Sequence, residues 1–355
     1  MSAKEEVCDF DSLYDAMMIC KRGIMWKDST AGFVANGLVN CLDLKDDLMS
    51  GKYKISKYTI FTIYEPKERV IVSTRMRDRV FQRSLCDNYL TEAVSKSFVY
   101  DNAACQKGKG TDFARKRLKV HMLRFYREHG RDGYVLKIDL KDFFGSTPHS
   151  VAKAAVNKRA KDKWAQERVA EIIDSFNQGE NPEIGLGLGS QVTQLIELAV
   201  LDDVEHYIKE KLRIKHHVRY NDDFILIHHD KDYLIYVKEA IEKKIEEKGL
   251  KLNKRKTQIF PITQPIKFLG FRFKLTDTGK ALMLILPKKV THERKKLRKL
   301  VGKAKRGEMT RAKVDECYKS WKAHAKKGNS YNLLKSMDDY YKSLWEDSTY
   351  ETHNS

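Results

Sequence analysis

The stretch Arg219-Tyr220-Asn221-Asp222-Asp223-Phe224-Ile225-Leu226-Ile227 places two adjacent acids between residues that favour β-strands. Adjacent carboxylates are rare inside a paired strand, because side chains alternate between faces and a buried charge is costly. The same two acids at the tip of a hairpin suit metal binding. An isolated Asp-Asp pair is most often an exposed turn, so the interpretation depends on the rest of the chain.

A second strand-like run, Gly133-Tyr134-Val135-Leu136-Lys137-Ile138-Asp139-Leu140, also contains an acid at its end and is followed by Lys141-Asp142-Phe143-Phe144. If the two strands are neighbours, Asp139 and Asp222 meet at one edge of a sheet. Carboxylates that converge from separate strands can hold Mg²⁺, which prefers oxygen ligands and shares them with substrate phosphates. The two runs together therefore predict a site of phosphoryl transfer.

Several motifs, in a consistent order, resemble those of reverse transcriptases. Tyr220-Asn221-Asp222-Asp223 resembles their Tyr-x-Asp-Asp box, and residues 139–144 resemble their first palm motif. Upstream, residues 64–69 and 77–82 are similar to the basic fingers of bacterial and group II intron enzymes. Downstream, residues 252–257 and 268–271 resemble the later palm motifs, so the resemblance covers roughly residues 58 to 275.

The resemblance implies an α+β right-hand polymerase with fingers, a palm containing an antiparallel sheet, and a thumb. We expect an N-terminal helical extension (1–57), fingers (58–135), a palm (136–286, with helices at about 149–180 contributing to the fingers), a basic helical thumb (287–345) and a tail (346–355). Residues 8–50 carry helical periodicity. Strands are expected near 59–64 and 69–73, and helices near 76–95, 111–128, 149–159, 163–178 and 192–212.

Composition agrees with a nucleic-acid partner. The chain has 355 residues, and its 68 Lys and Arg against 49 Asp and Glu give a formal charge of +19, which favours a polyanion. A membrane-surface or ribosomal protein shows the same excess. No apolar run is long enough to cross a membrane and no signal peptide opens the chain, so a soluble cytoplasmic protein is expected. Six scattered Cys without a C-x-x-C pair disfavour disulfides and a zinc site.

In the resembling family the acids bind two Mg²⁺ ions, for which Mn²⁺ is a possible substitute. Asp139 and Asp222 are the expected ligands, and the backbone carbonyl of Leu140 completes the shell. Asp223 is a further expected ligand that supports the site more than it bridges both ions. One ion would lower the pKa of the primer 3′-hydroxyl, and the other would hold the triphosphate and the leaving pyrophosphate.

Cations are expected to meet the phosphates. Lys256 resembles the lysine proposed to protonate the leaving pyrophosphate, and Lys254 and Arg255 are close enough to be alternatives. Lys67 and Arg69 match the family's triphosphate-binding fingers, where positive charge offsets the charge that develops on phosphate. An ordinary charged hairpin is the other interpretation of these two residues.

An aromatic residue is expected beneath the sugar. Phe144 lies five residues after Asp139, where this class of enzyme places the ring that excludes a 2′-hydroxyl. The resemblance therefore implies dNTPs as substrates. Phe143 is the competing core residue, because one of two adjacent aromatics at a strand edge usually points inward.

The segment after Pro287 is strongly basic. Between Pro287 and Ala312 there are eleven Lys or Arg and two acids. Such a segment is usually a solvated surface, and a helix charged on most faces cannot bury a wide apolar stripe. Directly after a palm it resembles a thumb that grips the RNA/DNA hybrid through phosphates. The expected contacts are Arg294, Lys295, Arg298, Lys299, Lys303 and Arg306.

The subfamily is indicated by Gly189-Ser190-Gln191-Val192-Thr193-Gln194. Intron and retroviral enzymes generally end this motif in Ser-Pro, whereas Thr-Gln resembles the Ser-Gln of diversity-generating retroelement reverse transcriptases. Glycine lets backbone approach a template base. We therefore expect Leu188 and Gly189 near the template base, and Gln194 near the base and the incoming dNTP, where Gln in place of Pro would loosen the fit.

This resemblance implies a partner RNA and a partner protein. The enzyme would copy a structured template RNA into cDNA with errors concentrated at adenines, and would work with a small basic accessory protein, a four-helix bundle that is pentameric in the family. A retron-like, phage-defence or solitary group II-like enzyme is the alternative within the class. A non-catalytic RNA-binding protein with a polymerase fold is the alternative outside it.

Overall fold

The computed structural model describes residues 2–64, 68–176 and 181–346. The chain forms two compact units. The first comprises Met1–Ala114 and Leu136–Ile259, and the second comprises Arg115–Val135 and Phe260–Ser355. The chain is an α+β protein with antiparallel strand pairs, as the sequence predicts.

Four helices open the first unit: α1 (Ala3–Cys8), α2 (Phe10–Cys20), α3 (Asp28–Ala35) and α4 (Gly37–Ser50). Ser2 and Glu5 form a capping box that begins α1. Helix α2 packs against both α4 and α5. The apolar residues of α4 are only partly buried: Leu44 and Leu48 lie in the core, whereas Leu38 and Leu42 are exposed.

A two-stranded hairpin follows, formed by β1 (Thr59–Ile63) and β2 (Arg69–Ser73), which pair antiparallel with Thr59 opposite Ser73. The next helical segment consists of α5 (Met76–Leu85), a π-helical turn (Cys86–Leu90) and α6 (Thr91–Ser95). These elements confirm the strands and the helix that the sequence predicts between residues 59 and 95.

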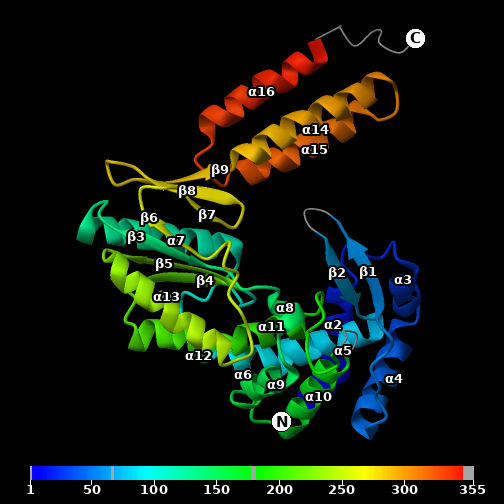
Figure 1. Ribbon diagram of the computed structural model, residues 1–355. Coiled ribbons are helices and arrows are strands. Elements are labelled where there is room, and N and C mark those ends of the chain that lie inside the picture. Colours follow the sequence, from blue (N-terminus) through cyan, green and yellow to red (C-terminus); the bar gives the residue numbers. More distant parts are fainter. Residues whose placement is uncertain (1, 65–67, 177–180, 347–355) are drawn as a thin grey trace. The chain divides into compact units, whose positions relative to one another are not determined.

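The helical core of the first unit is centred on α11 (Gln191–Val200), whose side chains from Leu195 to Val200 are all buried. Figure 1 shows α9, α10 and α11 gathered beside α5, and α11 contacts both α9 and α5. The remaining helices are α8 (Phe143–Ser146), α9 (His149–Asn157), α10 (Lys163–Asp174), α12 (Asp202–His206), a π-helical turn (Tyr207–Lys211) and α13 (Lys231–Glu246).

A four-stranded sheet carries the acidic motifs. Its strand order is β4-β5-β3-β6, formed by His216–Tyr220, Asp223–His228, Tyr134–Ile138 and Gln258–Pro261. Strand β3 therefore lies between β5 and β6, and the predicted adjacency of the two acid-bearing strands is confirmed. Residues Phe224–Ile227 of β5 are all buried, so this strand is a central part of the core.

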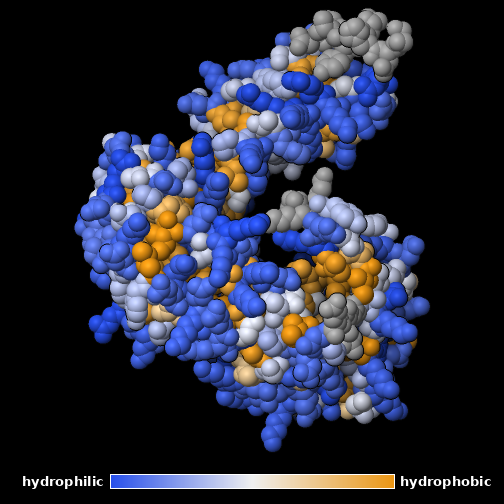
Figure 2. Space-filling model, in the orientation of Figure 1, coloured by the Kyte–Doolittle hydropathy of each residue, from blue (hydrophilic) through white to orange (hydrophobic). Residues whose placement is uncertain are grey.

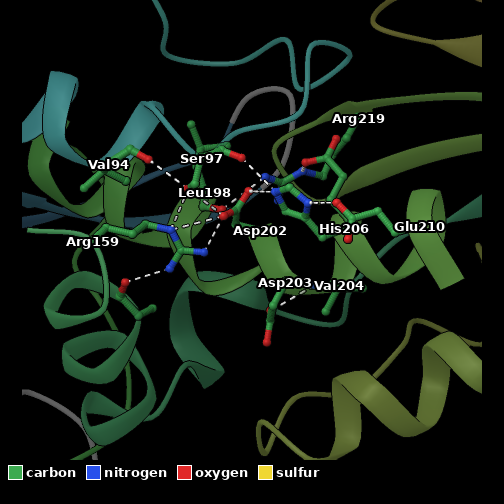
Figure 3. Close-up of polar contacts among 12 residues, drawn as sticks. Val94, Ser97, Arg159, Leu198, Asp202, Asp203, Val204, His206, Glu210 and Arg219 are labelled. Atoms are coloured by element: carbon green, nitrogen blue, oxygen red, sulfur yellow. Dashed lines mark hydrogen bonds and ion pairs between the residues drawn. The ribbon is translucent and has the colours of Figure 1, made fainter.

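A buried ionic network fixes the start of the β4–β5 hairpin (Figure 3). Arg219 and Glu205 are both fully buried, and Arg219 Nε donates to Glu205 Oε2 at 2.9 Å. Arg219 Nη2 also donates to the carbonyl of Leu198 at 3.1 Å. Close by, Asp202 accepts from Arg159 and Ser97. These contacts tie β4 to α11 and α12.

The second unit contains helix α7 (Thr111–His129), most of which belongs to it, and a three-stranded antiparallel sheet. The strands are β7 (Ile266–Phe268), β8 (Phe271–Leu275) and β9 (Ala281–Ile285). In this unit, Arg115 on α7 donates to the carbonyl of Leu269 and lies 4.7 Å from the ring centroid of Phe271. Its last helices are α14 (Pro287–Lys305), α15 (Arg311–Ala325) and α16 (Tyr331–Glu346).

Helix α14 is the predicted basic helix, but it buries more than its charge suggests. Leu297 and Val301 pack in an apolar cluster with Val314, Met337 and Leu344 from α15 and α16. The buried row is narrow, because Glu293, Leu297 and Val301 recur every four residues and most of the lysines and arginines around them are exposed.

The surface is mainly hydrophilic on the face that Figure 2 shows, and apolar side chains form separate patches. Among the described residues, none of the helices combines the length and apolar character needed to cross a membrane.

Candidate active site

The two adjacent acids lie at the turn of the β4–β5 hairpin. Tyr220 pairs with Asp223, so Asn221 and Asp222 form a two-residue loop. Asn221 has φ 53, a left-handed conformation that Asn tolerates better than most side chains. This turn chemistry places Asp222 at the tip and Asp223 at the first position of β5, as predicted.

Asp139 follows β3 and is held by the segment that leads to β6. Its carbonyl accepts from the Asn253 N–H at 2.8 Å, and Leu140 forms an isolated bridge with Leu252. The same segment supplies Lys256, whose Nζ lies 2.7 and 2.9 Å from the two carboxylate oxygens of Asp139. The motif around residues 252–257 is thus joined to the first acid by both backbone and side chain.

A second lysine pairs with a second acid. Lys137 Nζ lies 3.2 Å from Asp223 Oδ1, and these two side chains are only 20% and 26% exposed. Sequence reasoning did not single out Lys137. The signal was present, because Lys137 and Asp139 are two residues apart on one strand and so share a face.

The acids interact electrostatically. Burial and, next, the negative charges of Asp223 and Asp139 raise the pKa of Asp222 to about 6, although a backbone hydrogen bond and the Lys256 ammonium act to lower it. Asp222 therefore lies close enough to Asp223 and Asp139 to be affected by their charges. Their mutual repulsion is the condition under which a cation is bound favourably.

Glu197 is a fourth acid in this region that the sequence did not reveal. It is 2% exposed on α11, and its Oε1 accepts from the Thr147 hydroxyl at 3.1 Å. Burial raises its pKa well above the usual range, and the charge of Asp222 acts in the same direction. A single Glu within an apolar helix carries no pattern that distinguishes it from an exposed residue.

Asp139, Asp222 and Asp223 offer carboxylate oxygens, which are the ligands that a hard divalent ion prefers. Within residues 2–64, 68–176 and 181–346, no three His, Cys, Asp or Glu side chains are already gathered as a metal cluster. Lys256 contacts both oxygens of Asp139 and Lys137 lies against Asp223, so a bound ion would compete with these two ammonium groups. The carboxylates fit the implied ions once an ion competes with Lys256.

The two adjacent aromatics divide as expected, although the local structure differs from the expectation. Phe143 is buried and Phe144 is partly exposed. They lie in the short helix α8 and not at a strand edge, because Asp142 turns the chain with φ 44. A Cβ on Gly145 would approach the Asp142 carboxylate to 2.4 Å, so a larger residue at position 145 would require the Asp142 side chain to move.

The glycine loop before α11 is bonded to the β1–β2 hairpin. Val72 N–H donates to the Leu188 carbonyl at 3.1 Å, and Gly189 has φ 130 beside the Val72 carbonyl. Ser190 begins α11 by accepting from the Val192 N–H. Gln194 is partly buried, and its Oε1 accepts from Cys105 Sγ at 3.2 Å.

The remaining predicted cations are partly described. Lys67 lies outside the described residues, and Arg69 is an exposed residue at the start of β2. Lys254 and Arg255 are exposed, and of these three neighbouring cations Lys256 is the one paired with Asp139.

The predicted thumb residues all lie on or beside α14. Lys295, Arg298 and Lys299 are exposed, and Lys303 is partly exposed. Two of the arginines have contacts within the unit: Arg294 Nη2 donates to Ser336 Oγ at 3.3 Å, and Arg306 pairs with Glu308 at 2.6 Å.

Comparisons with solved structures find distant similarity to telomerases. The truncated apo telomerase of Candida tropicalis is 13% identical over 70% of this chain and 60% of that chain, with a TM-score of 0.49. A Candida albicans telomerase bound to a TWJ fragment of telomeric RNA is 13% identical over 75% and 55%, with the same TM-score. The chain thus spans little more than half the length of these proteins. No curated protein matches.

The family comparison is decisive. A model of the family described as reverse transcriptase (RNA-dependent DNA polymerase) matches residues 56–273, which include the hairpin acids, Asp139 and Lys256. The match covers more than half of the chain. The chain therefore belongs to the reverse transcriptase family of RNA-dependent DNA polymerases.

Proposed function

We propose that this reverse transcriptase copies a structured template RNA into cDNA by nucleotidyl transfer at Asp139, Asp222 and Asp223, within a diversity-generating retroelement. The observation that carries the site is the position of Asp139 at the end of β3, beside the β5 strand that starts at Asp223. Lys256 completes the arrangement through its contact with Asp139.

The implied divalent ions, Mg²⁺ or Mn²⁺, would polarise the primer 3′-hydroxyl and neutralise the triphosphate. Asp139, Asp222 and the Leu140 carbonyl would hold them, and Asp223 would support the site. Lys256 is about half exposed, so its ammonium can leave Asp139 and reach the pyrophosphate oxygens. There it would donate the proton that makes pyrophosphate a better leaving group.

Substrate choice would depend on Phe144. Its neighbour Phe143 is buried in the core, whereas Phe144 is partly exposed. Phe144 would therefore contact the sugar of the incoming dNTP and exclude a 2′-hydroxyl. Arg69, and Lys67 in the adjoining segment, would meet the triphosphate from the β1–β2 hairpin.

The domain boundaries given above are part of the proposal, with the fingers over 58–135, the palm over 136–286 and the thumb over 287–345. The exposed lysines of α14 would bind the phosphates of the RNA/DNA hybrid without sequence preference, and their contribution would weaken steeply with salt.

The retroelement assignment rests on Gln194 and the glycine loop. Leu188 and Gly189 would lie at the template base. The Gln194 side chain accepts a hydrogen bond from Cys105. This side chain can rotate, whereas a proline at position 194 would be held rigid by its ring. A looser fit at this position would favour misincorporation opposite adenine, and the enzyme would work with a small basic pentameric accessory protein and the structured RNA.

Primer extension tests the activity. The wild type, with primed RNA, dNTPs and Mg²⁺, should give cDNA, and Asp222→Ala should give none. Equal product from both, or no product from either when the cognate RNA and accessory protein are present, would favour an RNA-binding protein without catalysis.

Error spectra test the retroelement role. Gln194→Pro should reduce misincorporation opposite template adenine. Because proline also removes the Gln194 N–H that donates to the Ser190 carbonyl, Gln194→Ala is a second variant that keeps this bond. An unchanged spectrum in both would remove the explanation. Template and variable repeats that differ mainly at adenines near the gene would support the role, and their absence would favour a retron-like, defence or group II-like enzyme.

A further inference from the structure

Two lysines pair with the acids of the active site, and they differ in how firmly they are held. Lys256 lies in the turn before β6, and its side chain is 46% exposed. Lys137 belongs to strand β3, which is flanked by β5 and β6, and its side chain is 20% exposed. A substrate or ion can displace the first lysine by a rotation of one side chain. The second is more enclosed, because its side chain is less exposed and starts from a strand between two others.

Lys137 pairs with a buried oxygen of Asp223. Asp223 Oδ1 is buried and accepts no hydrogen bond from any described donor. The Lys137 ammonium lies 3.2 Å from this oxygen and forms an ion pair with it. A buried carboxylate oxygen that lacks such a charge would be costly, so Lys137 determines which way Asp223 points.

The direction matters because Asp223 adjoins Asp222 at the turn of the hairpin. Asp222 belongs to the two-residue turn and Asp223 opens β5, where the Lys137 contact holds the Asp223 carboxylate at β3. Without this contact the freed carboxylate would be available to an ion held by its neighbours.

We propose that Lys137 is a positioning residue that keeps the Asp223 carboxylate out of the metal shell and leaves Asp139 and Asp222 as the ligand pair. The inference rests on the proposed two-ion site and adds to it an internal counter-ion. In this arrangement Asp223 holds Lys137 beside the other acids. The positive charge of Lys137 then limits how tightly these acids bind an ion, which must later be released with pyrophosphate.

Binding of Mn²⁺ to the purified full chain, measured by electron paramagnetic resonance without RNA or dNTP, tests this inference. Lys137→Met should tighten Mn²⁺ binding on the order of tenfold, because a partly screened positive charge is lost and Asp223 becomes a ligand. In the Asp223→Asn background the same substitution should change the affinity by only about twofold, since no carboxylate is released. Lys137→Arg should keep the wild-type affinity.

The matched control is Lys141→Met, which removes a lysine two residues beyond Asp139 whose side chain is exposed. It should leave the Mn²⁺ affinity within about twofold of wild type, as expected for a solvated charge. Thermal unfolding of each variant establishes that it is folded, and a purely structural role for Lys137 would lower the melting temperature without tightening Mn²⁺ binding.

The outcomes separate the two proposals. If Lys137→Met fails to tighten binding, or tightens it equally with and without Asp223, the positioning role is overturned while the metal site stands. If the wild type binds no Mn²⁺ at these acids, so that Asp222→Ala leaves the signal unchanged, both the positioning role and the proposed metal site are overturned.

Discussion

Replacing Asp222 by Asn should stabilise the metal-free protein at alkaline pH. The carboxylate is forced into a buried place beside two other acids, and its pKa is raised from 3.8 to about 6. Between these two values the folded chain binds more protons than the unfolded chain, so folding stability falls as pH rises. The amide of Asn has nearly the same shape and carries no charge, so it removes this penalty.

The size of the effect follows from the shift. A pKa difference of this size corresponds to about 3 kcal/mol once the pH is above both values, and roughly half of it remains at pH 5. Because Asp222 keeps some access to solvent, we expect about 2 kcal/mol at pH 8. For a unit of this size that corresponds to a rise in melting temperature of about 4–8 °C.

Differential scanning fluorimetry in EDTA at pH 5 and pH 8 measures this effect. Glu239→Gln is the control, because it neutralises an exposed acid on α13 of the same unit. Saturating Mg²⁺ should raise the melting temperature of wild type and not of Asp222→Asn, which narrows the difference. Equal melting temperatures of variant and wild type at pH 8, or a gain that does not shrink at pH 5, would refute the electrostatic reasoning.

Three further substitutions test the roles of other residues. Lys256→Met should slow primer extension by about a hundredfold through loss of the proton donor, and single-turnover rates at saturating dNTP measure this, with Lys254→Met unaffected. Phe144→Ala should reduce discrimination against rNTPs by about tenfold in competitive incorporation assays, whereas Phe143→Leu should lower thermal stability and leave discrimination unchanged. Arg219→Met should destabilise the first unit by about 3–5 kcal/mol in denaturant unfolding, because it leaves the fully buried Glu205 without its partner, and Arg219→Met/Glu205→Met should recover much of the loss.

The β4–β5 hairpin and the existence of strand β3 could be predicted from the sequence, because nearby residues determine turns and strands. Asn before two acids favours a left-handed turn residue, and apolar runs on both sides favour strands, which together give β4, the turn and β5. The adjacency of β3 could be predicted only through the resemblance, since nothing in a single strand names its neighbour. Asp139 itself was identified from the strand-like run that ends in it.

Other features depend on contacts between residues far apart in sequence, which periodicity does not report. Glu197 and Glu205 each lie in helices and are buried because Thr147 and Arg219 approach them from elsewhere. Helix α14 is a further case, because its narrow apolar row is covered by α15 and α16, which its own sequence does not name. Short helix α8 replaced an expected strand edge because of the backbone conformation of one residue, Asp142.

The bond between Val72 and Leu188 has a genetic consequence. It couples the position of the β1–β2 hairpin to that of the glycine loop, although more than a hundred residues separate them in the sequence. A selection for polymerases with altered accuracy should therefore return alleles in codons 71 and 72 together with alleles in the loop, and changes at the two places should suppress one another.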